Sequence, residues 1–419
     1  MKFFIISSDG DGVGLALRLQ DEGHDVSIWV QNDKAAKRGS GLLARATPDS
    51  ITQDTVVIAD VTGSGAICDA IAESGVAVIG GSAVADKLEK DRRYAEAVMR
   101  ETGIKTPKTK YFTDWASAHA FVEKSDARLV FKPEGELSGV VPSYVSSDQE
   151  DMLEMLDVYA AASTKSVPSF ALQEFIEGTC VSTECWFNGF DFVLPFNHTI
   201  ERKQLMNGDI GPSGGCTGNV VWSCDDEDCP VCDATAAKMG EFLSSVRFCG
   251  PIDVNAVVSE GGVFGLEFTP RFGYDAMPTL LCSLLDQPIG ELLDGVARAS
   301  IDEMSLRSGF AAGIRVTVPP WPLEEEHKST GLPLRGLRKF DSFYPYDVMK
   351  SIEGNLCTSG GFNITGVALG YGGSIEESFS EARRIADKLR LPNKQYRTDL
   401  ADVCKADMRR LNRYTKAAA

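Results

Sequence analysis

Lys132 is the residue whose position most directly suggests chemistry. It follows the apolar run 129–131, which predicts a buried strand, and a glycine-containing loop over residues 133–139 comes next. A lysine held at a strand end beside such a loop can present a point charge to a phosphate group. The alternative is a solvated surface lysine, but the apolar run before it favours a built site. We therefore predict that Lys132 binds phosphate.

Oxygen-bearing side chains occur on two further predicted strands, residues 252–258 and 263–268. Glu267 lies among apolar residues on the second strand. Asp253 and Asn255 share one face of the first, because alternate residues of a strand point the same way. Mg²⁺ prefers carboxylate and amide oxygens and usually bridges phosphates as well. We predict a metal site centred on Glu267, with Asp253 and Asn255 as further ligands.

Glycine-rich segments occur at two places. Gly10, Gly12 and Gly14 follow the first predicted strand and could let the backbone approach a phosphate at a helix N-terminus. Their spacing is not G-x-G-x-x-G, so a tight turn is the simpler interpretation. In residues 209–218, DIGPSGGCTG, Pro212 stands beside four glycines. This composition predicts a shaped wall of a binding site.

Cysteines form a third pattern, C-x₄-C-x₂-C, at Cys224, Cys229 and Cys232. With a fourth ligand such as Cys216 or Cys249, these thiols could hold Zn²⁺. The spacing is not that of a standard zinc ribbon, and the four residues between the first two cysteines are acidic. An acidic surface loop whose thiols bind no metal is therefore the favoured interpretation.

Composition limits the class of protein. The 419 residues carry 42 Lys and Arg against 60 Asp and Glu, a net charge of −18. This acidity argues against a general nucleic-acid binder, although a local pocket can still be basic. Eleven cysteines, an odd number, fit a reduced compartment, and we expect neither an export signal nor a membrane-spanning stretch, because no segment resembles one. We expect a cytoplasmic monomer or homodimer that acts on small molecules, with no nucleic-acid or membrane partner.

The elements that position these residues change in character along the chain. Short apolar strands alternate with helical patterns over about the first 85 residues, which predicts a doubly wound parallel sheet. These strands are residues 3–6, 26–30, 55–59 and 76–79. A charged helix is expected from Asp86 to Gly103. The middle is antiparallel and turn-rich, with a hairpin signal at Asn188–Gly189. After about residue 305 strands return, with one clear helix at 375–389.

The order of these motifs resembles the ATP-grasp superfamily and, within it, the phosphoribosylamine–glycine ligases. Residues 209–218 resemble that family's D-T-G-P-N-T-G-G-M-G loop, and residues 267–273, EFTPRFG, resemble its E-F-N-x-R-F-G segment. Shorter matches lie at Leu88–Glu89, Val130–Lys132, Glu174–Gly178 and Gln395–Asp399. Together they cover nearly the whole chain.

The resemblance implies an α/β fold in three parts. Residues 1–85 would form the doubly wound domain, which precedes the ATP-grasp domain. Residues 86–305 would form the ATP-grasp domain, built of two α+β subdomains with the smaller, ATP-binding one at about 108–175. Residues 306–419 would form a small C-terminal α+β domain.

The resemblance also implies an activity: ATP, with Mg²⁺ or Mn²⁺, converts a carboxylate into an acyl phosphate, which an amine attacks to form an amide. By this resemblance, ATP would be bound by Arg92, Lys132, Glu174, Phe175, Ile176 and Glu184. The substrates would be bound by Lys203, Gly211, Pro212, Ser213, Gly214, Gly215, Arg271, Gly10 and Gly12. The metal ligands would be Glu267, Thr269, Asn255 and Asp253, and Arg271 and Lys132 would be catalytic.

Several positions depart from the family pattern. Arg92 replaces a lysine, Thr269 replaces an asparagine, and Cys180 replaces a glutamate that binds ribose, for which Glu184 is the substitute we consider. The first two loops of the N-terminal domain lack the family's amine-binding residues. Three functions therefore stay open: a ligase of purine biosynthesis that joins glycine to phosphoribosylamine, a related ligase with a different amine in specialised nucleotide metabolism, and a nucleotide-binding homologue without turnover.

Overall fold

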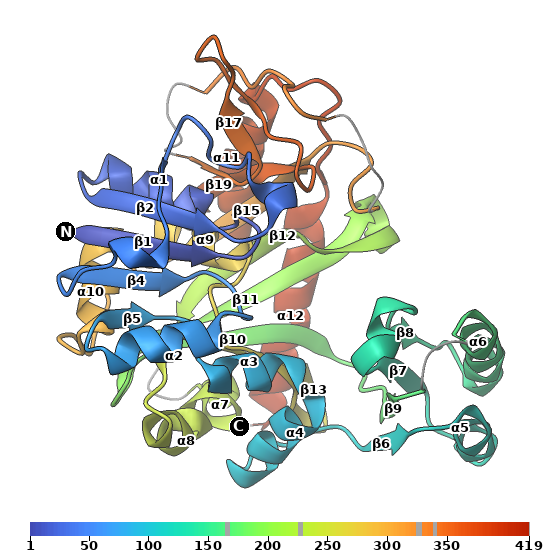
Figure 1. The fold of residues 1–419 in the computed structure, drawn as a ribbon. Helices are drawn as coiled ribbons and strands as arrows, with labels where there is room; N and C mark the ends of the chain where they lie inside the picture. The colour runs from blue at the N-terminus through green and yellow to red at the C-terminus, as the bar shows by residue number, and fades with distance from the viewer. Residues whose placement is uncertain (164–167, 225–228, 324–328, 338–341, 419) are drawn as a thin grey trace.

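Three sheets and a two-stranded ribbon form the framework of the protein (Figure 1). The computed structural model describes residues 1–163, 168–224, 229–323, 329–337 and 342–418. The acidic segments 225–228 and 324–326 lie outside these residues. The mixed α/β class expected from the sequence is confirmed.

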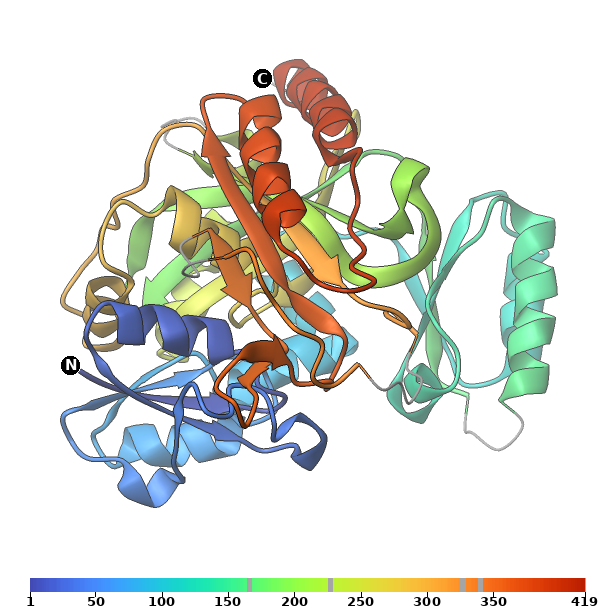
Figure 2. The ribbon, with the colours of Figure 1, turned by 90° about the horizontal axis from the view of Figure 1, so that it is seen from above.

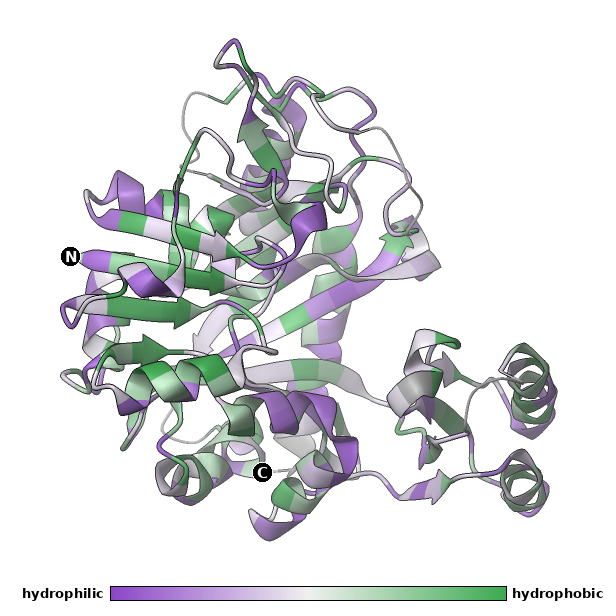
Figure 3. Ribbon diagram, in the orientation of Figure 1, coloured by the Kyte–Doolittle hydropathy of each residue, from purple (hydrophilic) through white to green (hydrophobic). Residues whose placement is uncertain are grey.

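The N-terminal sheet is parallel and covered on both faces. Its order is β3-β2-β1-β4-β5, with β1 (Lys2–Ser7), β2 (Asp25–Val30), β3 (Ala44–Arg45), β4 (Thr55–Ala59) and β5 (Ala77–Ile79). Phe3 and Ile5 pack with α1 (Val13–Asp21) and α10 (Ile289–Ala297), whereas Phe4 and Ile6 pack with α2 (Gly65–Glu73). Burial of both faces explains why β1 and β4 are almost wholly hydrophobic (Figure 3).

An eight-stranded antiparallel sheet runs through the rest of the molecule. Its order is β14-β13-β10-β11-β12-β15-β19-β16. These strands are β10 (Thr179–Asn188), β11 (Phe192–Met206), β12 (Ile210–Cys224), β13 (Cys249–Ser259), β14 (Gly262–Thr269), β15 (Phe310–Thr317), β16 (Phe343–Pro345) and β19 (Ile364–Gly372). Because Gly218 of β12 pairs with Ile314 of β15, one sheet continues across the division predicted at residue 305.

A smaller four-stranded sheet stands apart from the rest of the chain (Figures 1 and 2). Its strands, in the order β6-β9-β7-β8, are β6 (Thr109–Phe112), β7 (Leu129–Pro133), β8 (Tyr144–Val145) and β9 (Phe170–Glu174), and they pack with α5 (Trp115–Val122) and α6 (Gln149–Ala162). Phe131 and Phe170 lie at the centre of its own apolar core. Lys132 alternates with the buried Phe131, so its side chain faces away from this core.

The remaining elements connect and cover the sheets. They are α3 (Ala83–Lys90), α4 (Arg92–Glu101), α7 (Pro230–Ala234), α8 (Gly240–Ser245), α9 (Ala276–Thr279), β17 (Val348–Lys350), β18 (Leu356–Thr358), α11 (Ile375–Lys388) and α12 (Leu400–Ala418). α11 lies against β15 and β19, and α12 crosses strands β10 to β13. No helix in the described part of the chain is long and apolar enough to span a membrane.

Two helical features differ from the prediction. The charged segment after Asp86 forms two helices rather than one, because Asp91 leaves the helical conformation and its carboxylate caps α4 by accepting the Tyr94 N–H at 3.0 Å. The break places Arg92 at the first turn of α4. The long helix α12 was not predicted: its buried stripe of Leu400, Cys404 and Leu411 is set in a mostly polar sequence.

Candidate active site

A cleft opens between α3, α4, the loop after β7 and strand β14. It encloses about 1000 Å³, including its open mouth. Charged residues of both signs line it, among them Glu89, Arg92, Glu134 and Glu267. The small subdomain thus supplies one wall, and the eight-stranded sheet supplies the opposite one.

Lys132 extends from β7 towards the charges of this cleft. Burial lowers its pKa to about 8, the nearby Arg92 adds to this effect, and Glu267 opposes it. Lys203 of β11 acts on the same group. The fold therefore brings Lys132, Arg92, Lys203 and Glu267 together, although they lie far apart in the sequence.

Lys203 keeps its charge in this setting. Burial alone would lower its pKa, but Glu267 and Glu201 outweigh burial and raise the pKa above the usual value. Glu201, on the same strand, is half-buried, and its desolvation raises the pKa of its carboxyl group. Three cations and a carboxylate close together form a group that suits a polyphosphate with a divalent cation.

The expected metal ligands fall into two groups. Glu267 is exposed on β14 and pairs in register with Asn255 of β13. Asn255 accepts a hydrogen bond from Ser182 at 2.6 Å and donates one to Thr269 at 2.9 Å, so three oxygen-bearing side chains stand beside Glu267. This donor set fits a hard cation such as Mg²⁺.

Asp253 and Glu184 form the second group and lie beneath the surface. Asp253 is 7% exposed and Glu184 only 2%. Burial raises the pKa of Asp253 to about 7, with Glu201 adding to the shift. Glu184 accepts a hydrogen bond from the indole N–H of Trp186 at 3.1 Å, and burial raises its pKa. The structure therefore does not bring Glu184 to the cleft wall, where a ribose hydroxyl would need it, because packing on Trp186 holds the carboxyl group inside the sheet.

Arg271 is tied to a partner that the sequence did not suggest. Its guanidinium donates to both carboxylate oxygens of Glu89, at 2.9–3.2 Å, and lies 4.5 Å from the ring centre of Tyr274. Burial alone would lower the pKa of Arg271, but the charge of Glu89 outweighs burial, so the pKa of Arg271 is raised above its usual value. Glu89 also accepts a hydrogen bond from Thr62 at 2.7 Å. Arg271 is thus fixed in place as a permanent cation at the rim of the cleft.

Glu174 ends strand β9, and Phe175 and Ile176 follow it in the segment that leads to β10 of the large sheet. The Glu174 N–H donates to the carbonyl of Lys108, and the Phe175 N–H donates to that of Arg128, both at 2.9 Å. The Arg128 guanidinium also stacks 3.9 Å above the Phe175 ring. These contacts hold the segment firmly, and they occupy two of the amides that could have contacted a base.

The glycine-rich segment 211–215 forms the exposed start of β12, next to the β11–β12 turn. Its anchor was missed by the sequence analysis. Arg315 of β15 donates to the carbonyl of Gly214 at 2.9 Å, and its other nitrogens bind both oxygens of the fully buried Asp275 at 2.7 and 2.9 Å. The sequence did contain one signal for this anchor: Arg315 stands among apolar residues in a predicted strand, which suggests a buried, paired arginine.

The tail Gln395–Asp399 holds the same turn from the other side. Arg397, 1% exposed, donates to Asp209 at 2.7 Å and to Asp399 at 2.8–2.9 Å. Asp399 in turn accepts the N–H of Gly208 at 2.8 Å. The C-terminal segment that resembles the family pattern therefore shapes the predicted substrate wall.

The N-terminal glycines lie in a small hollow between the parallel sheet and the segment after β14. Gly10 donates its N–H to Ser7 at 2.8 Å, and Gly12 donates its N–H to Asp60 at 2.6 Å. Neither amide is available to a phosphate, in line with a tight turn. Asp60 is 4% exposed; burial, followed by the charge of Asp11, raises its pKa to about 7, and its second carboxylate oxygen has no partner.

Known proteins are similar to this chain in both sequence and fold. Residues 90–274 match the family model of the phosphoribosylglycinamide synthetase ATP-grasp (A) domain. The phosphoribosylamine–glycine ligase of Leifsonia xyli subsp. xyli is 25% identical, with 96% of this chain and 99% of the relative covered. That of Streptomyces coelicolor is 26% identical, with 80% of each covered.

Solved structures agree with this result. The phosphoribosylamine–glycine ligase of Thermotoga maritima superposes with a TM-score of 0.71 at 19% identity, over 95% of this chain and all of the other. A biotin carboxylase from Campylobacter jejuni superposes with a TM-score of 0.63 at 10% identity, over 94% of this chain and 92% of the other.

The fold is that of the ATP-grasp ligases, enzymes that use ATP to form a bond. Within that class the chain resembles the phosphoribosylamine–glycine ligases over nearly its full length.

The buried pair of Arg315 and Asp275 yields a first prediction. We expect Arg315→Met to lower the free energy of unfolding by about 3–5 kcal/mol, because it leaves the Asp275 carboxylate buried without a counter-charge. The control is Arg307→Met, whose pair with Asp286 is exposed at 46% and 59%, with an expected loss below about 1 kcal/mol. Urea denaturation measures both, and equal losses would contradict the prediction.

Asp60 yields a prediction about pH. Its pKa of about 7 lies above the ordinary 3.8, so the folded state holds the proton more tightly than the unfolded state. The carboxyl group therefore costs nothing at low pH and destabilises the fold increasingly as pH rises from about 4 to 7. Asp60→Asn should match the wild type in stability at pH 4 and exceed it at pH 8. Thermal melting across this range checks it, and parallel curves for the two proteins would argue against it.

Proposed function

We propose that this enzyme activates the carboxylate of glycine, or of another amino acid, and transfers it to the amino group of phosphoribosylamine or a related amine. The observation that carries the proposal is that Arg92, Lys203 and Glu267 all act electrostatically on Lys132, while Arg92 and Glu267 line one cleft. A carboxylate oxygen attacks the γ-phosphorus of ATP, and the bond to ADP breaks. The amine then attacks the acyl phosphate, phosphate leaves, and the nitrogen loses a proton.

The chain's own residues act mainly by position and charge. Lys132 and Arg92, from opposite walls, contact the phosphates of ATP. Lys203 neutralises the charge that develops on the transferred phosphoryl group. Arg271, held by Glu89, stabilises the acyl phosphate at the rim. Glu174 to Ile176 flank the base.

Mg²⁺, or Mn²⁺, would be held by Glu267 with Asn255, and Thr269 would orient the amide of Asn255. When bound, the cation would neutralise the phosphate oxygens. Asp253 contributes from below as a buried carboxylate rather than as a direct ligand, because it is almost inaccessible.

A second candidate differs in the amine. The hollow at the N-terminal glycines is lined by Asp11 and Asp60, by tyrosines and by apolar residues, with no lysine or arginine among the lining residues. Asp11 is already paired with Arg38 at 2.8 Å, so Asp60 is the carboxylate that suits an amine or hydroxyl group and disfavours a phosphate. If the amine binds here, this observation favours one without a phosphate group. The glycine-rich wall 211–215 would then hold the amino acid.

The wider expectations are part of the same proposal. The enzyme acts on small molecules in the cytoplasm, as a monomer or homodimer, and has no nucleic-acid or membrane partner. With phosphoribosylamine as the amine, its place is purine biosynthesis.

The testing experiment is ADP and phosphate release from Mg-ATP by the purified chain. Glycine is supplied with freshly made phosphoribosylamine, and then with a panel of amines without phosphate. Release that requires both glycine and phosphoribosylamine supports the first candidate. Release with a phosphate-free amine alone supports the second. Absence of release, while ATP still raises the melting temperature, would overturn both in favour of a binding protein without turnover.

Glu267→Gln tests the cleft. The amide keeps the shape but loses the charge that a divalent cation needs, so we expect ADP formation to fall by about 10²-fold or more. Glu260→Gln, in the exposed β13–β14 turn, is the matched control and should retain full activity. A Glu267 variant that turns over normally would remove Glu267 from the site.

Lys132 should make ATP affinity depend on pH. Its pKa of about 8, below the ordinary 10.5, means that the side chain is charged below pH 8 and loses its charge above it. We expect the Kd for ATP to rise as pH increases from 7 to 9.5. Lys132→Arg should flatten this rise, because arginine stays charged throughout. Calorimetric titration measures both profiles, and identical slopes would exclude Lys132 from phosphate binding.

A further inference from the structure

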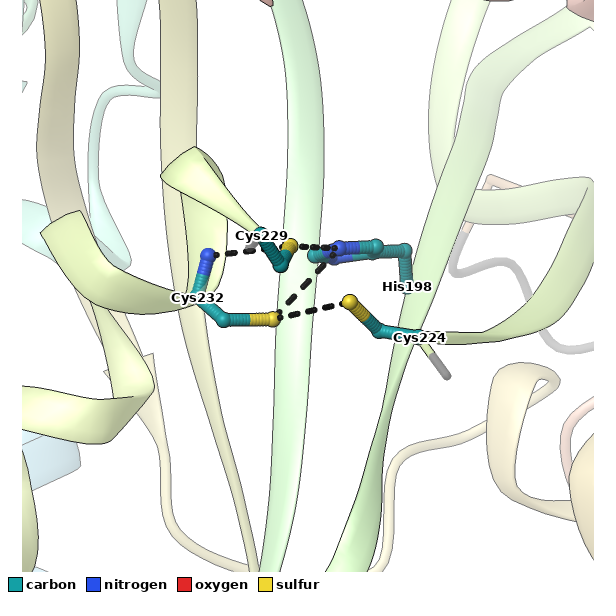
Figure 4. A group of neighbouring side chains, drawn as sticks. All are labelled: His198, Cys224, Cys229 and Cys232. Carbon is teal, nitrogen blue, oxygen red and sulfur yellow. Dashed lines mark hydrogen bonds between the residues drawn. The ribbon is translucent and has the colours of Figure 1, made fainter. Parts of the chain in front are cut away.

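One histidine and three cysteines meet on the sheet beside α7 and α12 (Figure 4). His198 comes from β11, Cys224 ends β12, Cys229 precedes α7, and Cys232 lies in its first turn. Their ligand atoms all lie within 4.8 Å of one another. The sequence suggested Cys216 or Cys249 as a fourth partner for the three thiols. Neither belongs to this group among the described residues, and His198 takes that place.

The distances suit a tetrahedral ion. Nε2 of His198 lies 3.2 Å from Sγ of Cys229 and 3.6 Å from Sγ of Cys232, and the sulfurs of Cys232 and Cys224 are 3.4 Å apart. Zinc bonds of about 2.0–2.3 Å at tetrahedral angles separate neighbouring ligand atoms by about 3.6–3.8 Å. These three pairs therefore lie within a few tenths of an ångström of tetrahedral spacing, and all four ligand atoms lie within 4.8 Å of one another. A disulfide would need about 2.0 Å between sulfurs.

The surroundings orient the ligands. The other ring nitrogen of His198, Nδ1, shares a hydrogen bond of 3.0 Å with the hydroxyl of Thr183, which directs Nε2 towards the thiols. Metal-bound histidines are commonly held in this way. The Cys232 N–H donates to Sγ of Cys229 at 3.4 Å and so orients that sulfur. His198 is only 5% exposed and Cys232 only 4%, so this half of the cluster is shielded from water.

The cluster lies on the face of the sheet opposite the active site. Thr183 pairs with His198, whereas the adjacent Ser182 pairs with Asn255 and binds its side chain, and neighbouring residues of a strand point to opposite faces. Beside the cluster, Val231 of α7 packs with Leu411 of α12. An ion here would touch no substrate and would join the end of the β11–β12 hairpin to α7 and the bed of α12.

We propose that His198, Cys224, Cys229 and Cys232 bind one structural Zn²⁺. Three thiolates and an imidazole at tetrahedral spacing are the ligand set that selects zinc, and four protein ligands leave no open position for catalysis. A disulfide between Cys229 and Cys232 is the competing use of these thiols. It would leave the convergence of His198 and Cys224 without a role.

The test is the metal content of the full chain, purified under reducing conditions without chelator. We expect about one zinc per chain by mass spectrometry of the metal. His198→Ala and Cys232→Ser should each lose most of it. Cys357→Ser, at a buried cysteine on β18, is the control and should retain it. His198→Cys should also retain zinc, because four thiolates form an equally good site.

Two further readouts separate the alternatives. Cobalt added to the metal-free chain should give the intense visible bands of a tetrahedral thiolate site, and zinc should displace it. Metal removal should lower the melting temperature by several degrees. Zinc below a tenth of an equivalent in the reduced chain would overturn the proposal. If two of the eleven thiols of a chain purified without reductant then also stay unreactive until they are reduced, the disulfide takes its place. Equal zinc in the His198→Ala variant and the wild type would overturn it as well.

Discussion

The ion pair between Arg271 and Glu89 holds together the parts of the chain that form the candidate active site. Glu89 belongs to α3, Arg271 follows β14, and Thr62, which also binds Glu89, follows the parallel strand β4. One bidentate ion pair therefore connects the N-terminal sheet, the helical linker and the large sheet. The pair is mostly buried, at 12% and 25% exposure, so removing either partner would leave a charge without compensation at the junction of three parts.

Near this ion pair, charges of the same sign lie close to one another, and nearby charges of opposite sign offset part of their repulsion. Lys132 and Arg92 repel one another, and this lowers the pKa of Lys132, whereas Glu267 restores part of the balance. Glu184 and Asp253 repel one another inside the sheet, with raised pKa values. A group of neighbouring cations gains stability when an anion binds beside it. This charge arrangement is what the proposed binding of a phosphate chain would use.

Much of this could be predicted from the sequence. The apolar strands of the N-terminal sheet and the hairpin at Asn188–Gly189 carry local signals, and these elements formed as expected. Lys132 and Glu267 stood out because each interrupts an apolar run. The pairing of Arg315 with Asp275 could not be predicted, since it joins residues 40 apart through tertiary packing alone. The burial of Glu184 could not be predicted for a similar reason. A glutamate on a strand is expected to be exposed, and only the tertiary structure shows that other residues cover its side of the sheet.

The two faces of the large sheet carry different kinds of side chain. On one face Asn255 and Glu267 border the cleft, and charged groups remain accessible there. On the other, His198 sits among thiols and apolar side chains next to α12. The hairpin β11–β12 serves both faces: its tip carries the glycine-rich wall, held by Arg315 and Arg397, and its base carries His198 and Cys224. A glycine-rich wall has little rigidity of its own. Its shape must therefore come from anchors at the tip, and the base must be fastened for those anchors to act on a fixed frame.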